Sequence, residues 1–287
     1  MKKILSILLA ILMLTTMVAL TSCNGDADTA ADTVVDTSAD TGAVDASNDF
    51  EYVKNNGELI IGITYFEPMN YFDETGKLVG FETEFATAVC EKLGLTPKFQ
   101  EIDWGSKEIE LQAKSIDCIW NGMTITPERQ ANMEISVPYM SNEQVIIVKS
   151  EYADAYTEAG SLKGKIVVAE AGSAGEELAT TDPFFADCEF TSVDTMAKAI
   201  MEVAAGTADA CVVDYITALG MIGEGTDYEN LVKVNGIEFA KEEYGIAFRK
   251  GSDIAEKVNA AIAELYADGK IADIAEWYSL ESQIIAQ

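Results

Sequence analysis

Histidine is absent from the 287 residues of this chain, and cysteine is sparse. Without histidine, the chain lacks the commonest general base of enzymes and the commonest ligand of metal ions. The cysteines are Cys23, Cys90, Cys118, Cys188 and Cys211. None are spaced as metal-binding pairs, so we expect no metal and no cofactor. Cys90, Cys118 and Cys211 lie in apolar runs, as small core residues do, and a disulfide among the last four stays open.

Basic residues are also few. The chain has 19 Lys and Arg against 49 Asp and Glu, which gives a formal charge of −30. A surface this acidic repels nucleic acid and anionic lipid headgroups, so we expect neither as a partner. An acidic, solubilising surface is a sufficient explanation of the charge.

The N-terminus has the pattern of an export signal. Lys2 and Lys3 precede an almost unbroken apolar run over residues 4–20, and no basic stop-transfer cluster follows it. This predicts a signal peptide over residues 1–22. Leu20-Thr21-Ser22-Cys23 matches the lipobox of bacterial lipoproteins, in which Cys23 would carry the lipid that tethers the protein to the membrane. The alternative is an ordinary signal peptide followed by a chance cysteine.

Residues 23–48 contain no Lys, Arg or aromatic residue and carry six aspartates. Mutual repulsion and the small apolar surface favour disorder over folding. We therefore expect a flexible acidic linker between the anchor and a domain that begins near residue 49. As a random coil, about 25 residues would span roughly 25–30 Å.

From residue 49 onward, strand-like and helix-like segments alternate, which predicts an α/β fold with mostly parallel sheets. Residues 59–63, 98–102 and 116–120 are apolar strands, and residues 80–93 and 107–114 have the pattern of helices. Gly94 is expected to end the first of these helices. A second unit, which starts near residue 164, repeats the same order of elements.

The repeat predicts two lobes. Two strand crossings, near residues 143–148 and 236–243, divide the chain into lobe 1 (49–145 and 241–287) and lobe 2 (146–240). In each lobe a buried strand ends in a polar residue, Asn121 in lobe 1 and Asp214 in lobe 2. Ligands of open α/β sheets bind beyond the carboxyl ends of the strands, so these residues should face each other across a cleft.

Residues 116–139 contain a candidate anion-binding corner. The strand breaks at Asn121, and Thr126 followed by Pro127 is a strong helix-start pattern. Arg129 then falls in the first helical turn, where the helix dipole disfavours a cation. A bound anion would explain that placement. The alternative is a surface arginine paired with Glu134.

Residues 57–278 resemble the polar-amino-acid family of periplasmic-type solute-binding proteins that serve ABC importers. The motifs that carry the resemblance are Gly57-Glu58-Leu59, Val79-Gly80-Phe81-Glu82, Thr124-Ile125-Thr126-Pro127-Glu128-Arg129, Ser136-Val137-Pro138-Tyr139, Leu162-Lys163-Gly164-Lys165 and Ala171-Gly172-Ser173. The resemblance implies a type II periplasmic-binding-protein fold that closes on a free L-amino acid, without catalysis. It also implies an extracytoplasmic location, permease subunits as partners and, most simply, a monomer.

The resemblance further implies which residues hold the ends of the amino acid. Arg129 would bind the α-carboxylate with its two-pronged guanidinium. Thr124 and the backbone at Asn121 and Gly122 would add polar contacts, and Gly122 would let the ligand approach the main chain. Asp214 would accept from the α-ammonium. Two points stay open. Asn121 replaces the Ser or small residue that is common in the family, which leaves the shape of the pocket unsettled. The alternative role of Asp214 is to cap the helix that follows it.

Other positions would shape the rest of the site. Phe66 and Trp104 match the side chains that sandwich the ligand, although each fits a core aromatic as well. Ser173 and Ala174 lie where a helix N-terminus in lobe 2 donates to the carboxylate. Glu170 would meet the ligand's side chain and would favour arginine, lysine or glutamine; the alternative is a solvated glutamate at a strand end. Glu67 is a weaker candidate for the same role.

Two other classes of function compete with transport. Cyclohexadienyl or arogenate dehydratases share the fold, and their chemistry needs an acid beside the ring, for which Glu170 is the evident candidate. No nucleophile–base pair supports other enzymology. Sensory receptors carry related domains, and the absence of a second apolar span after this domain counts against that class.

Overall fold

The computed structural model describes residues 46–287. The predicted signal peptide, the lipid anchor at Cys23 and almost all of the predicted linker lie outside these residues. No helix within residues 46–287 is long and apolar enough to cross a membrane.

The first sheet has five strands in the order β4-β1-β5-β13-β6. These strands are β1 (Glu58–Ile63), β4 (Thr96–Glu101), β5 (Cys118–Ile119), β6 (Met133–Ile135) and β13 (Ala247–Arg249). β1 is parallel to β4 and β5, whereas β13 is antiparallel to β5 and β6. The helices of this lobe are α1 (Asp49–Asn56), α2 (Phe81–Leu93), α3 (Lys107–Gln112), α4 (Pro127–Asn132), α8 (Ile254–Ala267) and α9 (Lys270–Trp277).

The second sheet has six strands, five of them in the order β11-β7-β10-β8-β9, with β12 paired to β7. These strands are β7 (Met140–Lys149), β8 (Ile166–Glu170), β9 (Glu189–Val193), β10 (Ala210–Asp214), β11 (Leu231–Lys233) and β12 (Lys241–Tyr244). Its helices are α5 (Ala174–Thr181), α6 (Met196–Ala205) and α7 (Tyr215–Met221). The short elements are β2 (Tyr71–Phe72), β3 (Leu78–Val79), η1 (Trp104–Ser106), η2 (Ser150–Tyr152), η3 (Pro183–Phe185) and η4 (Glu281–Gln283).

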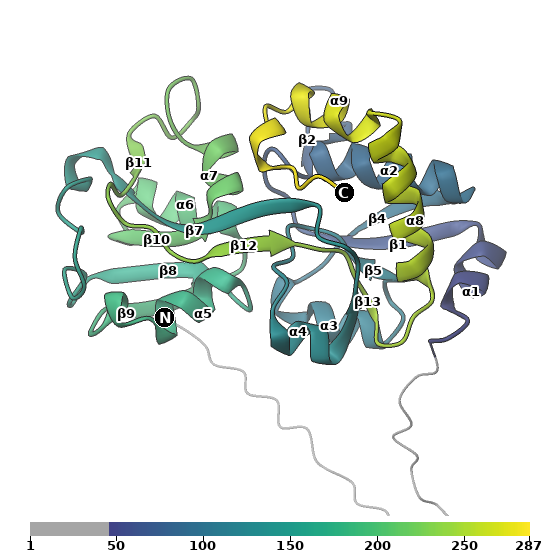
Figure 1. Cartoon of the computed structure of the whole chain (residues 1–287). Coiled ribbons are helices and arrows are strands. Elements are labelled where there is room, and N and C mark those ends of the chain that lie inside the picture. The colour runs from purple at the N-terminus through teal and green to yellow at the C-terminus, as the bar shows by residue number, and fades with distance from the viewer. Residues whose placement is uncertain (1–45) are drawn as a thin grey trace, which may run out of the picture. The chain divides into compact units, whose positions relative to one another are not determined.

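The α/β class and the two-lobed architecture are confirmed, but the expectation of mostly parallel sheets is wrong. In each sheet a parallel core is joined by antiparallel strands. The reason is the return path of the chain: β7 and β12 lie side by side and antiparallel where the chain crosses between the sheets (Figure 1). The predicted lobe boundaries at residues 145 and 241 fall within or beside these two strands and stay our proposal.

Local sequence signals placed most helices correctly. The helix predicted over residues 80–93 is α2, and Gly94 ends it in a left-handed conformation with φ of 70°. Its amide donates to the carbonyls of Cys90 and Glu91, which satisfies the last turn. α3 is shorter than predicted and ends at Gln112.

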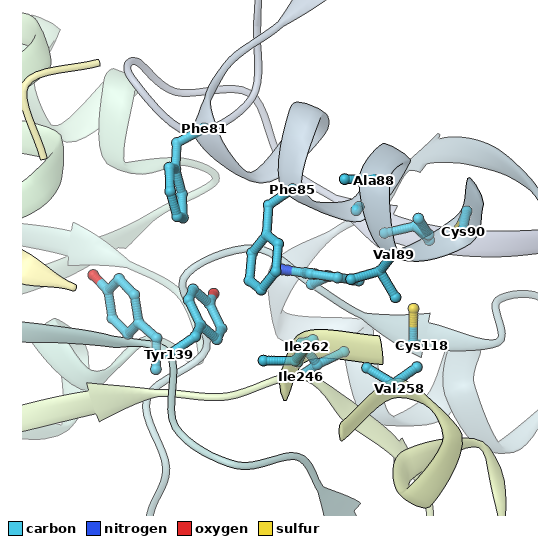
Figure 2. Close-up of a cluster of buried hydrophobic side chains, with 14 of the residues drawn as sticks. Phe81, Phe85, Ala88, Val89, Cys90, Cys118, Tyr139, Ile246, Val258 and Ile262 are labelled. Atoms are coloured by element: carbon cyan, nitrogen blue, oxygen red, sulfur yellow. The ribbon is translucent and has the colours of Figure 1, made fainter. Parts of the chain in front are cut away.

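The core of lobe 1 is built on aromatic contacts between α2 and the strands. Phe85 meets Trp120 edge to face with ring centroids 5.0 Å apart, and meets Tyr139 at 5.5 Å. Figure 2 shows Phe81, Phe85 and Tyr139 pointing toward one another. Burying a large side chain of this kind contributes about 1.5–3 kcal/mol. This packing holds α2 against the strand that carries the Asn121–Gly122 turn.

Arg249 is the centre of a buried ion network in lobe 1. Arg249 is 1% exposed, and its Nε donates to Asp49 at 2.6 Å while Nη2 reaches Asp117 at 3.3 Å. Its Nη1 donates to the carbonyls of Leu111 and Ile116. One guanidinium therefore ties together α1, the end of α3 and the start of β5.

The cysteines of the described region are all free. Cys90, Cys118 and Cys211 are buried, as their apolar surroundings predicted, and Cys188 is half-buried. Burial raises the pKa of all four thiols, which keeps them protonated and unreactive near neutral pH.

Candidate functional site

Arg129 lies where the sequence placed it, at the start of a helix, but points into the protein. Thr126 caps α4 by accepting from the Arg129 amide at 3.1 Å, and Pro127 is the first helical residue, as predicted. The helix has only six residues, so Arg129 belongs to its first and last turns alike. The Arg129 side chain is 8% exposed. The alternative of a surface pair with Glu134 is therefore wrong, and Glu134 lies 3.9 Å from Lys250 instead.

The Arg129 guanidinium holds two carbonyl oxygens and no carboxylate. Nη1 donates to Thr124 at 2.8 Å, and Nη2 donates across the lobes to Gly172 at 3.2 Å. Within residues 46–287, no ion pair neutralises it at 4.0 Å or less. Burial lowers the pKa of Arg129, and the charge of Asp214 is the largest influence that opposes this shift. A buried, unpaired cation is costly, so this arrangement favours a bound anion.

Asp214 ends β10 and is 2% exposed. Its carboxylate accepts from the Tyr244 hydroxyl at 2.7 Å and from the Gln144 amide. It stands at the N-cap position of α7 but makes no capping bond, so the helix-cap alternative is wrong. Burial, followed by the charge of Glu242, raises the pKa of Asp214 to about 7. A ligand ammonium would relieve that charge.

Thr124 is tied to Asp214 through the crossover strand β12. The Thr124 hydroxyl donates to Oε2 of Glu242 at 3.0 Å, and the Gln144 amide donates to the same oxygen at 3.0 Å. Gln144 in turn contacts Asp214. Sequence reasoning missed Glu242, because nothing in its local sequence separates it from the exposed acidic residues around it.

Asn121 and Gly122 form the turn after β5. The Asn121 side chain bonds Thr64 and Asn70 through both its oxygen and its nitrogen, so it braces lobe 1. Gly122 has φ of 58°, and its amide donates to Glu82 at 2.8 Å. A Cβ at Gly122 would lie 3.4 Å from the Phe66 ring. The structure thus brings Phe66 and Gly122 together.

Trp104 is not brought into the Phe66 cluster. Both aromatics are buried, but Phe66 packs in the core around α2, whereas Trp104 packs with Leu111 and Met133. In the structure, the face of the Trp104 ring contacts Lys107, with the Lys107 Nζ 4.7 Å from its centroid. The core interpretation of Trp104 therefore accounts for what is observed.

Lys107 is the binding candidate that sequence reasoning overlooked. It is 5% exposed, and its Nζ donates to the carbonyl of Gly172 at 2.9 Å, beside Arg129. Burial and the charge of Arg129 lower the pKa of Lys107 to about 8. A signal was present: Lys107 opens α3, where a cation is disfavoured, which is the reasoning that singled out Arg129.

On the lobe 2 side, Ser173 caps α5 by accepting from the Glu176 amide at 3.1 Å, and Ala174 is the first helical residue. The loop before the cap, at Gly172, receives both lobe 1 cations. The predicted helix N-terminus therefore lies next to Arg129.

Glu170 ends β8 and is 2% exposed, so the solvated alternative is wrong. Its Oε1 has no hydrogen-bond partner within residues 46–287. Burial, followed by the charge of Asp214, raises the pKa of Glu170 to about 8 despite the opposing charge of Lys107. Glu67, in contrast, is exposed, and its pKa is raised by partial burial and by Asp227.

Two cavities lie between the lobes, and each has a volume of about 510 Å³. Thr124, Gln144, Ala174 and Glu242 are among the residues that line the first. Lys107, Arg129, Gly172 and Ser173 are among those that line the second. The other six predicted residues line neither cavity: Phe66, Trp104, Asn121, Gly122, Glu170 and Asp214. Within the described part of the chain, no cluster of metal-ligating side chains is present.

The fold and the site define a two-lobed α/β binding protein of the type II periplasmic class, with opposite charges presented from its two lobes. The model of the bacterial extracellular solute-binding proteins, family 3, matches residues 59–281, and the chain belongs to this family. The family's members are extracytoplasmic binding proteins.

Among curated relatives, the L-cystine-binding protein TcyJ of Escherichia coli (strain K12) is 31% identical over 80% of this chain and 85% of its own. The arginine-binding extracellular protein ArtP of Bacillus subtilis (strain 168) is 30% identical over 78% of this chain and 87% of its own.

Among solved structures, a substrate-binding protein of an ABC uptake transporter from Streptococcus pneumoniae, with bound histidine, is 30% identical. It has a TM-score of 0.72 and covers 81% of this chain and 96% of its own. An ancestral amino acid-binding protein described as a precursor of cyclohexadienyl dehydratase is 28% identical. Its TM-score is 0.70, and the match covers 80% of this chain and 98% of its own.

Proposed function

We propose that this chain is the extracytoplasmic substrate-binding component of an amino acid ABC importer, which delivers a free L-amino acid to the permease. The observation that carries the proposal is the buried Arg129 of lobe 1. Its guanidinium has no carboxylate partner, and the charge of Asp214 in lobe 2 acts to raise its pKa. Opposite charges on the two lobes match the two ends of a zwitterion.

The ligand's carboxylate would take the place of the Gly172 carbonyl on Arg129, since a carboxylate can accept both prongs of the guanidinium. Its ammonium would reach Asp214. The helix N-terminus at Ser173 and Ala174 favours the same carboxylate, and Phe66 beside Gly122 supplies apolar contact. Because these contacts come from both lobes, the amino acid favours the closed form.

Glu170 supports a ligand whose side chain is cationic or bears an amide. It is buried with one oxygen unpartnered, so a donor on the ligand would satisfy it. Relatives that bind arginine, and one structure with histidine, are consistent with such a ligand.

A screen of the twenty common amino acids and cystine tests the proposal. Thermal-shift and calorimetric measurements on the chain without residues 1–23 should show at least one strong stabiliser. A ligand at about a hundred times its Kd adds roughly 2.7 kcal/mol to the free energy of unfolding. Glu170→Gln should weaken a ligand with a cationic side chain more than a neutral one. A screen without any binder would refute the transport function.

A dehydratase is the second candidate, because one structural neighbour is a precursor of such an enzyme and Glu170 keeps its proton at neutral pH, as a general acid must. The curated relatives are binding proteins, and we propose the same for this chain. Turnover of prephenate or arogenate by the purified protein, lost in Glu170→Gln, would select the enzyme instead.

We also propose that Cys23 carries a lipid that anchors the protein to the outer face of the cell membrane. The support is the lipobox at Leu20-Thr21-Ser22-Cys23. After expression in a bacterial host, the wild type should sediment with membranes and Cys23→Ser should remain soluble. Cys188→Ser is the matched control and should sediment like the wild type. Equal distribution of wild type and Cys23→Ser would remove the anchor from the proposal.

A further inference from the structure

Helix α7 of lobe 2 packs against lobe 1 as well as against its own lobe. Ile216, in its first turn, is fully buried in the hydrophobic cluster around α2. Met221, at its end, packs against this cluster and against one of lobe 2. The Ile216 amide donates to Asn142 of the crossing strand β7 at 3.4 Å. The start of α7 is therefore held where the chain crosses between the lobes.

Gly220, near the end of α7, lies against the backbone of lobe 1. A Cβ added at Gly220 would lie 2.5 Å from both the carbonyl carbon and the carbonyl oxygen of Glu67, and 2.7 Å from the nitrogen of Pro68. A Cβ does not approach other atoms within 3.0 Å, and backbone atoms cannot turn aside as the tip of a side chain can. Only glycine therefore fits at this position while α7 and the Glu67–Pro68 peptide are in contact.

The backbone conformation at Gly220 does not itself require glycine. Gly220 is helical, and its φ lies outside the left-handed region. Within a helix, glycine is less favourable than any other residue except proline. Close approach to the Glu67–Pro68 peptide is therefore the physical reason for glycine at this position.

The contact at Gly220 connects two residues of the proposed ligand site. Phe66, which lies beside Gly122, directly precedes the Glu67–Pro68 peptide, and Asp214 directly precedes α7. Gly220 lies about 9 Å along the helix from Asp214. The seating of α7 on this peptide therefore sets how closely the Asp214 side of the cleft approaches the Phe66 side.

We propose that Gly220 is a positioning residue for amino acid binding. Its missing side chain lets α7 seat on the Glu67–Pro68 peptide when the lobes close, which brings Asp214 to the ligand held by Arg129. In the open form this contact is released, because the end of α7 that lies away from the crossing strands moves with lobe 2. This inference rests on the proposed function and adds to it the contact that limits closure.

Two substitutions that favour the helix but add volume test the inference on the chain without residues 1–23. Gly220→Ala should raise the Kd of the amino acid that the screen identifies about tenfold or more, and Gly220→Leu should raise it further. Without ligand, both variants should unfold at the temperature of the wild type or above it, because alanine and leucine are better helix formers than glycine. Leu219→Ala shortens the exposed neighbour on the same helix and is the control, which should change the Kd less than about twofold.

Small-angle X-ray scattering is a second readout, which follows closure of the lobes directly. Saturating ligand should reduce the radius of gyration of the wild type, and it should reduce that of Gly220→Ala by less. A purely structural role of Gly220 would instead lower the stability of the variant and leave the ligand-induced compaction of its folded form unchanged.

The outcomes separate the inference from the proposed function. Wild-type affinity and wild-type compaction in Gly220→Ala would overturn the role of Gly220 and leave the transport function intact. So would a loss of stability without ligand, or a failure of both variants to fold, because the contact would then belong to the fold itself rather than to closure. A wild type that binds no amino acid would overturn the proposed function, and the inference with it.

Discussion

Arg129→Ala should abolish tight amino acid binding. In the structure, this guanidinium is buried and donates to Thr124 and Gly172, and a ligand carboxylate would replace the weaker acceptor on the other lobe. Truncating one partner of a buried, hydrogen-bonded charge pair costs about 2–5 kcal/mol. The Kd should therefore rise by roughly 30- to 4,000-fold, as measured by calorimetry with the ligand that the screen identifies.

The matched variant Arg129→Lys separates charge from shape. It keeps the positive charge but loses the planar fork, so its affinity should fall between those of the wild type and Arg129→Ala. The unliganded stability of Arg129→Ala should change little, since the wild-type side chain is an unpaired buried cation whose burial is itself costly. An unchanged Kd in Arg129→Ala would show that the carboxylate is held elsewhere.

Arg249→Met should produce the largest loss of stability. Arg249 is 1% exposed and holds Asp49 and Asp117, both nearly fully buried, together with the carbonyls of Leu111 and Ile116. Removing it leaves the buried Asp117 without a cation and Asp49 with only the half-buried Lys114 at 3.2 Å, for which a cost of about 3–5 kcal/mol is expected. For a domain of this size, each kcal/mol lowers Tm by about 2–4 °C. Urea and thermal unfolding would measure both quantities.

The exposed pair between Lys163 and Asp187 is the control for this prediction. Its atoms lie 2.8 Å apart, but both side chains are largely in solvent, so Lys163→Met should cost at most about 1 kcal/mol. The triple variant with Asp49→Asn and Asp117→Asn should recover part of the loss, because it removes the uncompensated charges along with Arg249. A loss in Arg249→Met no larger than in Lys163→Met would mean that the network is not a structural tie.

Local patterns were enough to place the elements around the site. Helix starts and stops depend on residues within one turn, so Thr126-Pro127 and Gly94 located the ends of α4 and α2 from sequence alone. The strand that ends at Asp214 was also located from sequence alone, because an apolar run there ends in a polar residue. Strand direction was not, because whether a strand runs parallel or antiparallel depends on how the chain returns between the lobes.

Which side chains meet was beyond the reach of local patterns. Phe66 and Trp104 were expected to sandwich one ligand, and their spacing in the sequence did not indicate that they pack in different hydrophobic clusters. Asn121 was expected to offer its backbone to the ligand, and nothing in the sequence indicated that its side chain bonds Thr64 and Asn70. These contacts join residues far apart in the sequence, and hydrophobic spacing carries no information about such partners.

The sequence by itself determined the class of the protein, the two similar α/β units and the corner in which a cation stands at a helix start. The tertiary structure alone decided which charges are buried together. Lys107 meets Gly172 across 65 positions of chain, and Glu170, at the end of β8, is only 2% exposed in the folded protein. Burial turns ordinary surface residue types into unpaired charges, because the energy of a charge depends on its surroundings rather than on its neighbours in sequence.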